Sequence, residues 1–296
     1  MDLEKLTTEN RNEHSMTLHQ LNALQIIQLM NEEDSKVPLA IKKVEKEIAA
    51  AVEAIVERLQ IGGRLIYIGA GTSGRLGILD AAECVPTFGV SPDLVVGKIA
   101  GGKQAILKAV EGAEDSEQFG QDDLVEIQLT KNDTVVGIAA SGRTPYVIGG
   151  LKYAQTIGAK TISLSCNANS EISNYAEIAI EVVPGPEILT GSTRLKAGTA
   201  QKLVLNMLST ASMIGIGKVY KNLMVDVQPT NEKLRVRAIR IIQQATECST
   251  LEAEQAFKDS NERVKVAITM VLLDQSKEQA ENTLLQNKGF IQDSIN

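Results

Sequence analysis

The sequence predicts an α/β fold in which a mainly parallel sheet is covered by helices on both faces. From Arg64 onward, short apolar runs rich in β-branched residues recur along the chain. Each run is followed by small residues, and each then gives way to a helical pattern. Strands that alternate with helices in this way form parallel sheets, because each crossover needs a helix to return the chain. We therefore expect a three-layer sandwich.

Helices are expected ahead of the first strand. From about Leu18 to Leu59 the apolar residues recur at helical spacing, and Pro38 stands where a helix start tolerates its missing N–H group. Two or more helices therefore precede the sheet, and we assign residues 1–54 to an N-terminal helical region.

Five segments are expected to form the strands of the sheet. They read RLIYIGAG (64–71), LVVGKIAGG (94–102), DTVVGIAAS (133–141), KTISLSC (160–166) and EIAIEVV (177–183). In parallel sheets with helices on both faces, ligands bind beyond the carboxyl ends of the strands. The residues that follow each run are therefore the candidates for function.

A loop and a long helix follow the last strand. The chain after Pro184 is rich in Pro, Gly, Ser and Thr, and a helical pattern of small residues then begins near Lys196. From about Arg235 to the end the pattern is helical and strongly charged. We place the sheet domain at residues 55–218 and a C-terminal helical subdomain at residues 219–296.

Composition narrows the possible partners. Thirty basic and 37 acidic side chains give a net charge of −7, and no basic cluster indicates nucleic acid or an anionic membrane as a partner. Cys84, Cys166 and Cys248 lack the spacing of a zinc site or a disulfide framework. Neither a signal peptide nor a membrane-length apolar run is evident. We expect a soluble, cytoplasmic protein with a small ligand.

The first strand ends in a phosphate-binding turn. Gly69-Ala70-Gly71-Thr72-Ser73-Gly74 fits G-x-G-x-x-G, a turn that offers backbone N–H groups and a helix N-terminus to an anion. A dinucleotide site would also need an acidic residue at the end of the next strand, whereas Asp93 precedes that strand. Hydroxyl donors at Thr72 and Ser73 favour a terminal phosphate over NAD.

A second loop repeats this arrangement. IYIGAGTSGRLG and VVGIAASGRTPY both lead from a strand through Ser-Gly-Arg toward a helix, so that Ser141 matches Ser73 and Thr144 adds a hydroxyl. Two such loops on one sheet could converge on one anion or bind two. The alternative is that these Ser and Thr residues serve as helix N-caps, a common use of both types.

Several longer motifs resemble one family. GAGTSGRLGILDAAEC, AVEGAED, AASGRTPYV, LTGSTRLKAGTAQKLVLNMLST and NLMVDVQPTNEKL, together with the opening LTTENRN, look like the N-acetylmuramic acid 6-phosphate etherases, which have the sugar isomerase (SIS) fold. The resemblance covers nearly the whole chain. It implies a SIS-type sandwich and a phosphosugar-binding role for residues 55–218.

The resemblance also implies a reaction. Etherases of this family cleave the D-lactyl ether of N-acetylmuramic acid 6-phosphate to N-acetylglucosamine 6-phosphate and D-lactate in cell-wall recycling. They use elimination and then hydration, with neither metal nor cofactor, so we expect none here. By resemblance Glu83 protonates the departing lactate and Glu114 is the acid/base nearer C2. Chemistry alone leaves the two roles exchangeable. The alternative is that Glu83 merely ends a helix and that Glu111, Glu114 and Asp115 form a solvated acidic run.

The substrate carries a phosphate and a carboxylate, so local donors must offset the negative charge of the chain. The candidates for substrate or phosphate binding are Gly71, Thr72, Ser73, Gly74, Ser141, Gly142, Thr144, Ser192, Thr193 and Lys196. Arg75 and Arg143 could act here or pair with nearby carboxylates. His14 and His19 lie far from the loops in sequence, and we expect them at the surface or at an interface.

Two other functions remain open from the sequence. One is a SIS-fold regulator that senses a phosphosugar without converting it, and the other is a sugar-phosphate isomerase, which has no ether to break. No basic helix-turn-helix segment precedes the sheet, which argues against a transcriptional regulator. By resemblance we expect a homodimer, with the N-terminal helices and the long helix after Gly198 as interface material.

Overall fold

The computed structural model describes residues 6–108, 110–229 and 231–295. The predicted N-terminal region and the AVEGAED motif therefore begin at positions outside the described residues. The chain folds into two compact units. The first combines the residues up to Ala81 with Asp93–Ser209, and the second combines Ala82–Pro92 with the residues from Thr210 onward. The sequence-based boundaries at 54 and 218 stay predictions.

The first unit contains a five-stranded parallel sheet, as the sequence predicted. Its order is β2-β1-β3-β4-β5. The strands are β1 (Leu65–Gly69), β2 (Val95–Ile99), β3 (Thr134–Ala139), β4 (Lys160–Ser165) and β5 (Ile178–Glu181). Every residue of β1 and β3 is buried, which explains their continuous apolar runs.

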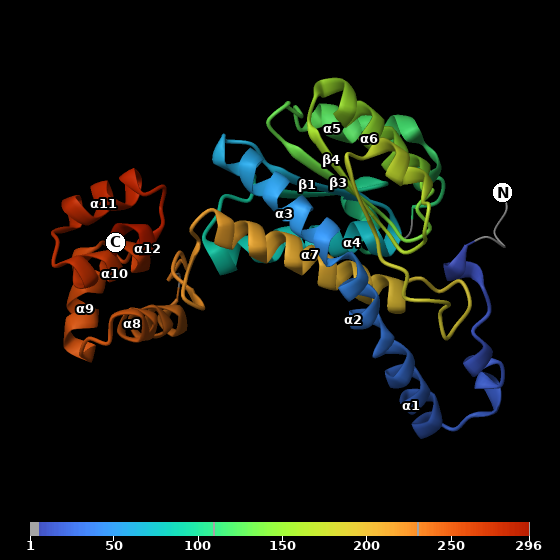
Figure 1. Cartoon of the computed structure of the whole chain (residues 1–296), viewed down its shortest axis with the longest axis horizontal. Helices are drawn as coiled ribbons and strands as arrows, with labels where there is room; N and C mark the ends of the chain where they lie inside the picture. The colour runs from blue at the N-terminus through green and yellow to red at the C-terminus, as the bar shows by residue number, and fades with distance from the viewer. Residues whose placement is uncertain (1–5, 109, 230, 296) are drawn as a thin grey trace. The chain divides into compact units, whose positions relative to one another are not determined.

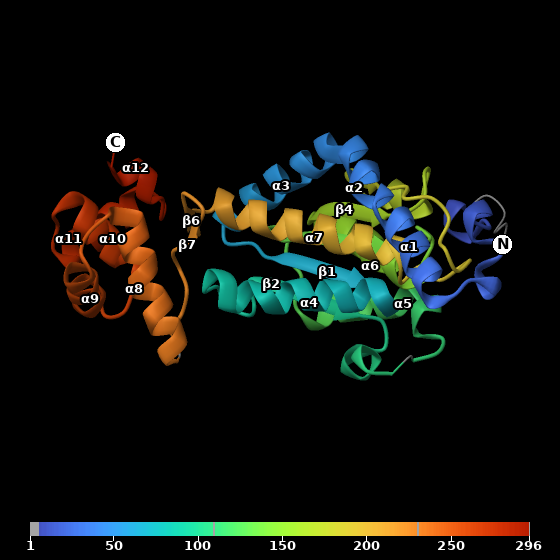
Figure 2. The same ribbon diagram turned by 90° about the horizontal axis from the view of Figure 1, so that it is seen from below.

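Helices cover both faces of this sheet and form the outer layers of the sandwich (Figures 1 and 2). One face carries α5 and α6, and the other carries α3, α4 and α7. Their bounds are α3 (Glu45–Gln60), α4 (Gly71–Phe88), α5 (Glu117–Glu126), α6 (Pro145–Ile157) and α7 (Lys196–Gly215). The predicted α/β three-layer fold is therefore confirmed.

Asp80 fixes α4 against its neighbours in the first unit. The buried Asp80 carboxylate accepts hydrogen bonds from Tyr67 Oη of β1 at 2.9 Å, Asn206 Nδ2 of α7 at 2.7 Å and Ser209 Oγ of α7 at 3.1 Å. Burial raises the pKa of Asp80, and these three donors oppose that rise. One side chain thus ties the sheet and two helices together.

The N-terminal helices precede the sheet, as expected. They are α1 (Ala23–Asp34), α2 (Lys36–Ile41) and α3, with short 3₁₀ turns at Thr7–Glu9, Glu13–Ser15 and Leu18–Gln20. Asn22 and Gln25 form a capping box that starts α1. Pro38 lies in the first turn of α2, where no helical N–H bond is lost. Within α1, all of which is described, Glu33 alone is buried.

The second unit is mainly helical. It contains the hairpin β6 (Val219–Tyr220) and β7 (Leu223–Met224), followed by α8 (Glu232–Thr246), α9 (Thr250–Asp259), α10 (Val264–Leu273), α11 (Lys277–Gln286) and α12 (Ile291–Ile295). Its core is apolar and includes Val225, Ile242, Phe257 and Ile268. Ala82–Pro92 joins this unit through contacts such as the close approach of Gly89 to the carbonyl of Asp226.

Candidate active site

The two Ser-Gly-Arg loops leave the sheet at the same edge and side by side. Strands β1 and β3 are parallel neighbours, with Gly69 paired to Ile138, and each runs directly into its loop. Strand β2 lies on the other side of β1, so the strand order reverses here. Such a reversal opens a crevice at the carboxyl edge of the sheet, the usual ligand position in this architecture.

The first loop is a tight turn that depends on glycine. Gly71 has a φ of 52° at the start of α4. A Cβ added at Gly74 would lie 2.6 Å from the carbonyl oxygen of Gly69, so no larger residue fits there. The chain can therefore turn sharply from strand to helix and present its N–H groups to an anion, as the motif predicts.

Helix α7 lies against this first loop. Ser73 Oγ donates a hydrogen bond of 2.9 Å to Gln201 Oε1, and both side chains are buried. A Cβ on Gly198 would lie 3.4 Å from the Thr72 methyl carbon and 3.5 Å from the Thr193 carbonyl oxygen. The structure thus brings Thr72, Ser73 and Thr193 together at the start of α7. Gln201 is not among the site residues expected from the sequence, because its amide is indistinguishable there from other polar positions on a long helix.

The second loop uses its polar groups differently from a simple helix cap. Gly142 has a φ of 73°, and Ser141 Oγ accepts a hydrogen bond of 3.3 Å from the backbone N–H of Arg143. Thr144 occupies the N-cap position of α6, but its side chain makes no capping hydrogen bond to the described chain. The capping alternative therefore does not describe Thr144, whose hydroxyl is not used by the helix.

A third loop supports the second one. Asn167, which follows β4, donates hydrogen bonds of 3.0 Å from Nδ2 to the carbonyl of Ala140 and to Thr8 Oγ1. Its Oδ1 accepts from the N–H of Thr8 at 3.3 Å. This buried amide joins the opening segment of the chain to the second loop. The sequence held a usable signal, because Asn167 follows a strand in the way Ser73 and Ser141 do.

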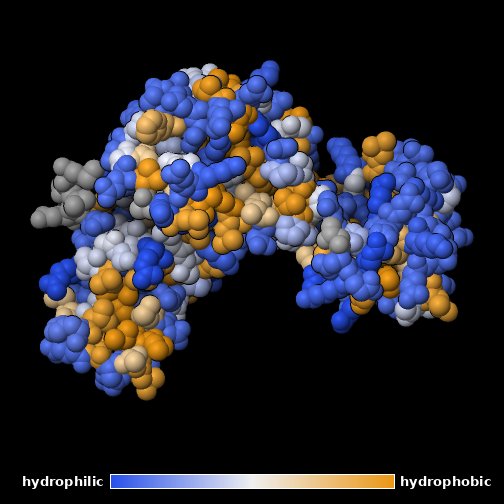
Figure 3. Space-filling model, turned by 180° about the vertical axis from the view of Figure 1, so that it is seen from behind, coloured by the Kyte–Doolittle hydropathy of each residue, from blue (hydrophilic) through white to orange (hydrophobic). Residues whose placement is uncertain are grey.

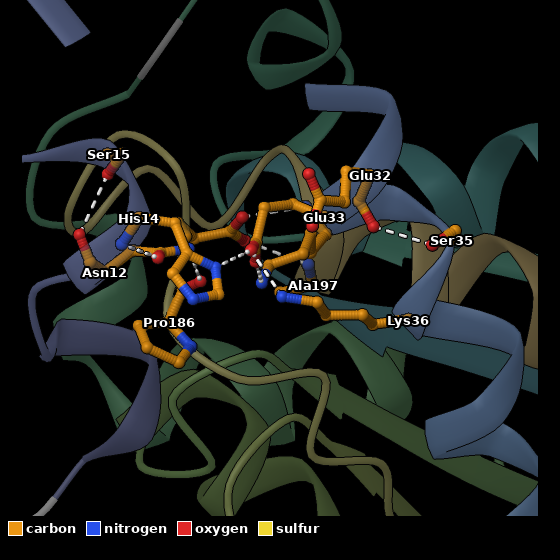
Figure 4. Close-up of polar contacts among 11 residues, drawn as sticks. Asn12, His14, Ser15, Glu32, Glu33, Ser35, Lys36, Pro186 and Ala197 are labelled. Atoms are coloured by element: carbon orange, nitrogen blue, oxygen red, sulfur yellow. Dashed lines mark hydrogen bonds and ion pairs between the residues drawn. The ribbon is translucent and has the colours of Figure 1, made fainter. Parts of the chain in front are cut away.

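Lys196 lies in a buried ion cluster around the Glu33 carboxylate. Figure 4 shows Glu33 in this cluster with dashed contacts to His14 and Lys36. Lys196 Nζ donates to Glu33 Oε2 at 2.6 Å, and both side chains are almost fully buried. His14 Nδ1 and Lys36 Nζ contact the other oxygen of the same carboxylate. Burial alone would raise the pKa of Glu33, but the three partners hold that pKa well below its usual range. The use of Lys196 as a substrate donor stays a prediction.

The N-terminus of α7 is occupied by another carboxylate. Glu187 accepts hydrogen bonds of 2.9 Å from the backbone N–H groups of Lys196 and Ala197. Burial raises the pKa of Glu187, against the effect of these two donors and of the nearby ammonium. Ser192 and Thr193 form the turn just before this helix, where their N–H groups bond to the carbonyls of Leu189 and Gly191.

Glu83 lies inside α4 and not at its end. The helix continues for five residues beyond it, with Pro86 in the final turn. Glu83 is exposed and lines a cavity of about 370 Å³ in the second unit, together with Thr87, Met224 and Arg237. The guanidinium of Arg237 in the same walls can pair with a carboxylate of a guest, and Glu83 can act on such a guest when it is protonated.

Glu114 belongs to the first unit. It lies in the 3₁₀ turn Ala113–Asp115, directly before α5. Gly112, at the N-cap position of this turn, has a φ of 75°. Glu114 is exposed, and its place in a turn ahead of a helix leaves the carboxylate accessible.

The remaining candidates have structural roles or lie at the surface. Arg75 Nε donates to the carbonyl of Ile106 at 2.9 Å, and His14 and His19 are exposed. Burial raises the pKa of Cys166, so its thiol is a poor nucleophile. Among the residues that the structure describes, no three His, Cys, Asp or Glu side chains gather as a metal site. No described helix is long and apolar enough to cross a membrane.

Models of known domains match most of the chain. Residues 47–155 match the N-terminal SIS domain of glucokinase regulatory protein, and residues 108–211 match the SIS domain. Residues 221–261 match the C-terminal lid domain of glucokinase regulatory protein. Among solved structures, a putative phosphosugar isomerase from Bacteroides fragilis has a TM-score of 0.52 at 21% identity, covering 65% of this chain and 91% of that one. This likeness shows the SIS fold.

Full-length relatives identify the family. N-acetylmuramic acid 6-phosphate etherase 2 of Lactiplantibacillus plantarum is 62% identical over all 296 residues, and both chains are covered completely. The corresponding protein of Enterococcus faecalis is 60% identical with the same coverage. The etherase of Listeria monocytogenes is 61% identical over 293 residues, which cover 99% of each chain. The chain belongs to the N-acetylmuramic acid 6-phosphate etherase family.

Proposed function

We propose that this protein cleaves the D-lactyl ether of N-acetylmuramic acid 6-phosphate, releasing N-acetylglucosamine 6-phosphate and D-lactate. The reaction is a carbon–oxygen lyase reaction of amino-sugar recycling. The observation that carries this proposal is the identity of about 60% with etherases over the entire length of the chain.

The chemistry follows from the open-chain form of the sugar. A base removes the proton from C2, which the neighbouring aldehyde makes acidic. The bond between C3 and the ether oxygen breaks, its electron pair leaves with the lactyl oxygen, and an acid protonates that oxygen. Water then adds to the unsaturated aldehyde, with its hydroxyl at C3 and a proton at C2. The site therefore needs an acid, a base and a firm hold on the phosphate.

We assign the phosphate to the two Ser-Gly-Arg loops. Adjacent strands and a reversal of strand order at this edge support the assignment, as does the uncommitted hydroxyl of Thr144. Backbone N–H groups at the start of α4 would supply further donors. Gly71, Thr72, Ser73, Gly74, Ser141, Gly142 and Thr144 make up this phosphate site, with Ser192 and Thr193 near the start of α7.

Glu83 and Glu114 are the proposed acid and base. Glu83 stands nine residues beyond Gly74 on the same helix, a rise of about 14 Å, which a phosphosugar with its lactyl group can span. Its place at a cavity wall with Arg237 supports the role at the lactyl end, where a carboxylate must be accommodated. Glu114 would then act at C2.

The assembly proposed here is a homodimer in the cytoplasm, without nucleic acid as a partner. Leu24 and Ile27 of α1 are 64% and 61% exposed. Hydrophobic residues gather over this helix in the space-filling view (Figure 3). Apolar side chains on a projecting helix are suited to burial against a second copy.

A phosphosugar-sensing regulator is the second candidate function. The matches to the SIS and lid domains of glucokinase regulatory protein favour it. A regulator would bind the substrate and leave it intact, so release of D-lactate separates the two functions. The isomerase alternative predicts a changed sugar without lactate.

The test is to incubate the purified chain with N-acetylmuramic acid 6-phosphate in oxygen-18 water and measure D-lactate. We expect lactate release, with the label on the C3 hydroxyl of the sugar and not in the lactate. Glu83→Gln should lower the rate by about 10²–10⁴-fold at retained substrate affinity, because general acid catalysis contributes about that factor. Glu57→Gln, at an exposed position of α3, is the matched control and should keep the full rate.

Absence of lactate with a folded, substrate-binding chain would overturn the etherase proposal in favour of the regulator. Label found in the lactate would exclude cleavage at C3. A full rate in Glu83→Gln would remove Glu83 from the mechanism without affecting the reaction assigned to the chain.

A further inference from the structure

The second unit contains a cavity of about 680 Å³ that the etherase mechanism does not use. Its walls come from Gly89 after α4, Lys218, the segment 225–229, the segment 261–266 and the end of α11 with the turn that follows. This volume lies in the range of small-molecule sites in proteins. We call it the basic cavity, for the side chains described next.

Four cationic side chains line the basic cavity, from three separate parts of the unit. They are Lys218, Arg263, Lys265 and Lys288. The acidic side chains in the same walls are Asp226, Glu262 and Glu281. Whether the cavity favours an anion depends on which of these charges are already paired.

Two lysines share one carboxylate oxygen. Lys218 Nζ lies 3.3 Å from Asp226 Oδ2, and Lys265 Nζ contacts the same oxygen. Burial lowers the pKa of Lys265; Asp226 opposes this effect, and the positive charge of Lys218 adds to it. A single carboxylate balances one of the two ammonium groups, so positive charge remains in a partly buried place.

The other two acids have partners of their own. Glu281 Oε1 accepts from Arg263 NH1 at 2.7 Å, and Glu262 pairs with Arg235. Among the described wall residues, Asp226 is therefore the one acid left to balance Lys218, Lys265 and Lys288, and it contacts the first two. The cavity carries an excess of positive charge although the whole chain is acidic.

The start of α10 adds to this positive potential. Arg263 is the N-cap residue of this ten-residue helix, and Lys265 lies in its first turn. Cations are favoured at the opposite end of a helix, since the N-terminus carries the positive end of the dipole. A half-buried lysine in this position is unfavourable without an anion nearby, and Asp226 is shared with Lys218.

We propose that the basic cavity binds a phosphorylated metabolite that carries hydroxyl groups, at a site separate from the Ser-Gly-Arg loops. Ammonium groups bind phosphate as point charges, and three of them can surround one phosphate. The side-chain amides of Gln228 and Asn261 and the carboxylates of Glu262 and Glu281 offer partners for hydroxyl groups. The cavity is larger than inorganic phosphate needs, which favours a sugar phosphate.

A ligand here would contact the residues that hold the end of α4. A Cβ on Gly89 would lie 1.9 Å from the carbonyl oxygen of Asp226, so the turn after α4 is pressed against the same aspartate that both lysines use. Glu83 lies six residues before this turn. A ligand in the basic cavity would therefore contact residues that pack against the end of α4, the helix that carries Glu83.

The experiment separates this cavity from the phosphate loops by mutation. In a Ser73→Ala/Ser141→Ala chain, which is designed to weaken the first site, N-acetylglucosamine 6-phosphate is titrated by calorimetry and by amide NMR. We expect binding to persist and the amide signals of Gly89 and Gly289 to shift. Unphosphorylated N-acetylglucosamine should produce neither effect, and inorganic phosphate should bind more weakly than the sugar phosphate.

Lysine variants then assign the binding. Lys288→Gln, at an exposed position that leaves the Asp226 pairs intact, should weaken the remaining binding at least about tenfold, and Lys218→Gln should do so as well. Lys258→Gln makes the same charge change on α9, outside the cavity walls, and should have no effect.

Loss of all binding in the Ser73→Ala/Ser141→Ala chain would overturn the proposal. So would equal weakening by Lys258→Gln and Lys288→Gln, which would indicate a general charge effect. Equal affinity for inorganic phosphate and the sugar phosphate would overturn the assignment of a hydroxylated ligand. None of these results depends on lactate release, so the etherase proposal stands or falls separately.

Discussion

Gly142 shows how one residue sets the shape of a phosphate loop. Its φ of 73° lies in the region that favours glycine, and an added Cβ would lie 2.3 Å from Ser170 Oγ. Ser170 Oγ in turn donates to the carbonyl of Asn167 at 2.8 Å, beside the amide that holds the second loop. The position therefore excludes a side chain for two independent reasons.

Gly142→Ala should destabilise the fold by about 2–4 kcal/mol, since it combines backbone strain with a clash against a buried network. Gly102→Ala is a matched control because Gly102 has a φ of 68° and open space around its Cβ position. That change should cost about 1 kcal/mol. Urea denaturation of both variants measures the difference. Equal losses would show that the contact with Ser170 is unimportant.

At the residue scale, the sequence predicts the positions of turns better than it predicts which side chains form hydrogen bonds or ion pairs with each other. The glycines at 71, 74 and 142 could be assigned from local patterns, because a positive φ or a close backbone approach leaves few residue types available. The partners of Ser73 and Lys196 could not be assigned. Gln201 and Glu33 are 128 and 163 residues away from them in the chain, and nothing local to either residue reports such a contact.

At the element scale, an ion pair joins the starts of the two central strands. Asp133 is buried just before β3, and Arg64 just before β1 donates to both of its oxygens, with Nη2 to Oδ2 at 2.8 Å and Nε to Oδ1 at 3.1 Å. The N–H of Thr130 adds a bond of 2.8 Å. Burial alone would raise the pKa of Asp133, but these donors outweigh it and place that pKa below its ordinary value.

This pair predicts a pH dependence of stability. A carboxyl whose pKa is lowered by folding contributes stability above its unfolded pKa of about 3.9, and the contribution disappears as the pH falls toward the folded value. Asp133→Asn should therefore cost about 3–5 kcal/mol at pH 7, as loss of one partner of a buried pair does. The difference from the natural chain should shrink below about pH 4.

Urea denaturation of both chains between pH 3 and 7 is the measurement. Asp122→Asn, on the exposed side of α5, is the control and should leave stability almost unchanged at every pH. If Asp133→Asn lowers the free energy of unfolding by the same amount at every pH down to 3, the ionised Asp133 carboxylate does not have the stabilising role assigned to it.

The five strands of the sheet could be predicted because each is a short apolar run with a clear change of pattern at its end, and β1, β3 and β4 are buried along almost their whole length. The hairpin of β6 and β7 could not. Each of its strands has two residues, too few for any periodicity to be visible. Its turn includes Lys221 at a φ of 55°, a residue type that gives no turn signal in the sequence.

At the scale of the whole molecule, α1 is the element on which the proposed homodimer depends. It extends away from the sheet of the first unit (Figure 1), and Leu24 and Ile27 lie largely in solvent. Leu24→Glu/Ile27→Glu should weaken the proposed homodimer by more than about 2 kcal/mol, because charges would replace the apolar contact. Light scattering across a dilution series measures the change.

Leu251→Glu is the control for this prediction, since Leu251 is 78% exposed on α9 and should tolerate a charge. Monomer at all concentrations in the unmodified chain would rule out the homodimer. If the double substitution leaves the dissociation constant of the dimer unchanged, the interface lies elsewhere.

The sequence predicted the order of the N-terminal helices, the sheet domain and the C-terminal helices along the chain. It did not predict which segments belong to each of the two compact units. A helical C-terminal part was visible from its charged periodicity, whereas Ala82–Pro92 belongs to the second unit although it lies in the middle of the sheet domain. Local patterns report which element a segment forms. They do not report which distant segment it packs on.

The ion pair of Glu33 and Lys196 has a consequence for synthesis of the chain. Helix α1 leaves the ribosome early, and Lys36 and His14, which contact Glu33 Oε1, are made with it. The buried ammonium of Lys196, which contacts Glu33 Oε2, arrives 163 residues later. Until Lys196 is made, Glu33 Oε2 is without the ammonium that it contacts in the fold, so complete burial of this carboxylate with α1 in its final place is unfavourable. The last strand of the parallel sheet, β5, is also made before Lys196. Docking of the N-terminal helices should therefore be a late step of folding, following formation of the sheet.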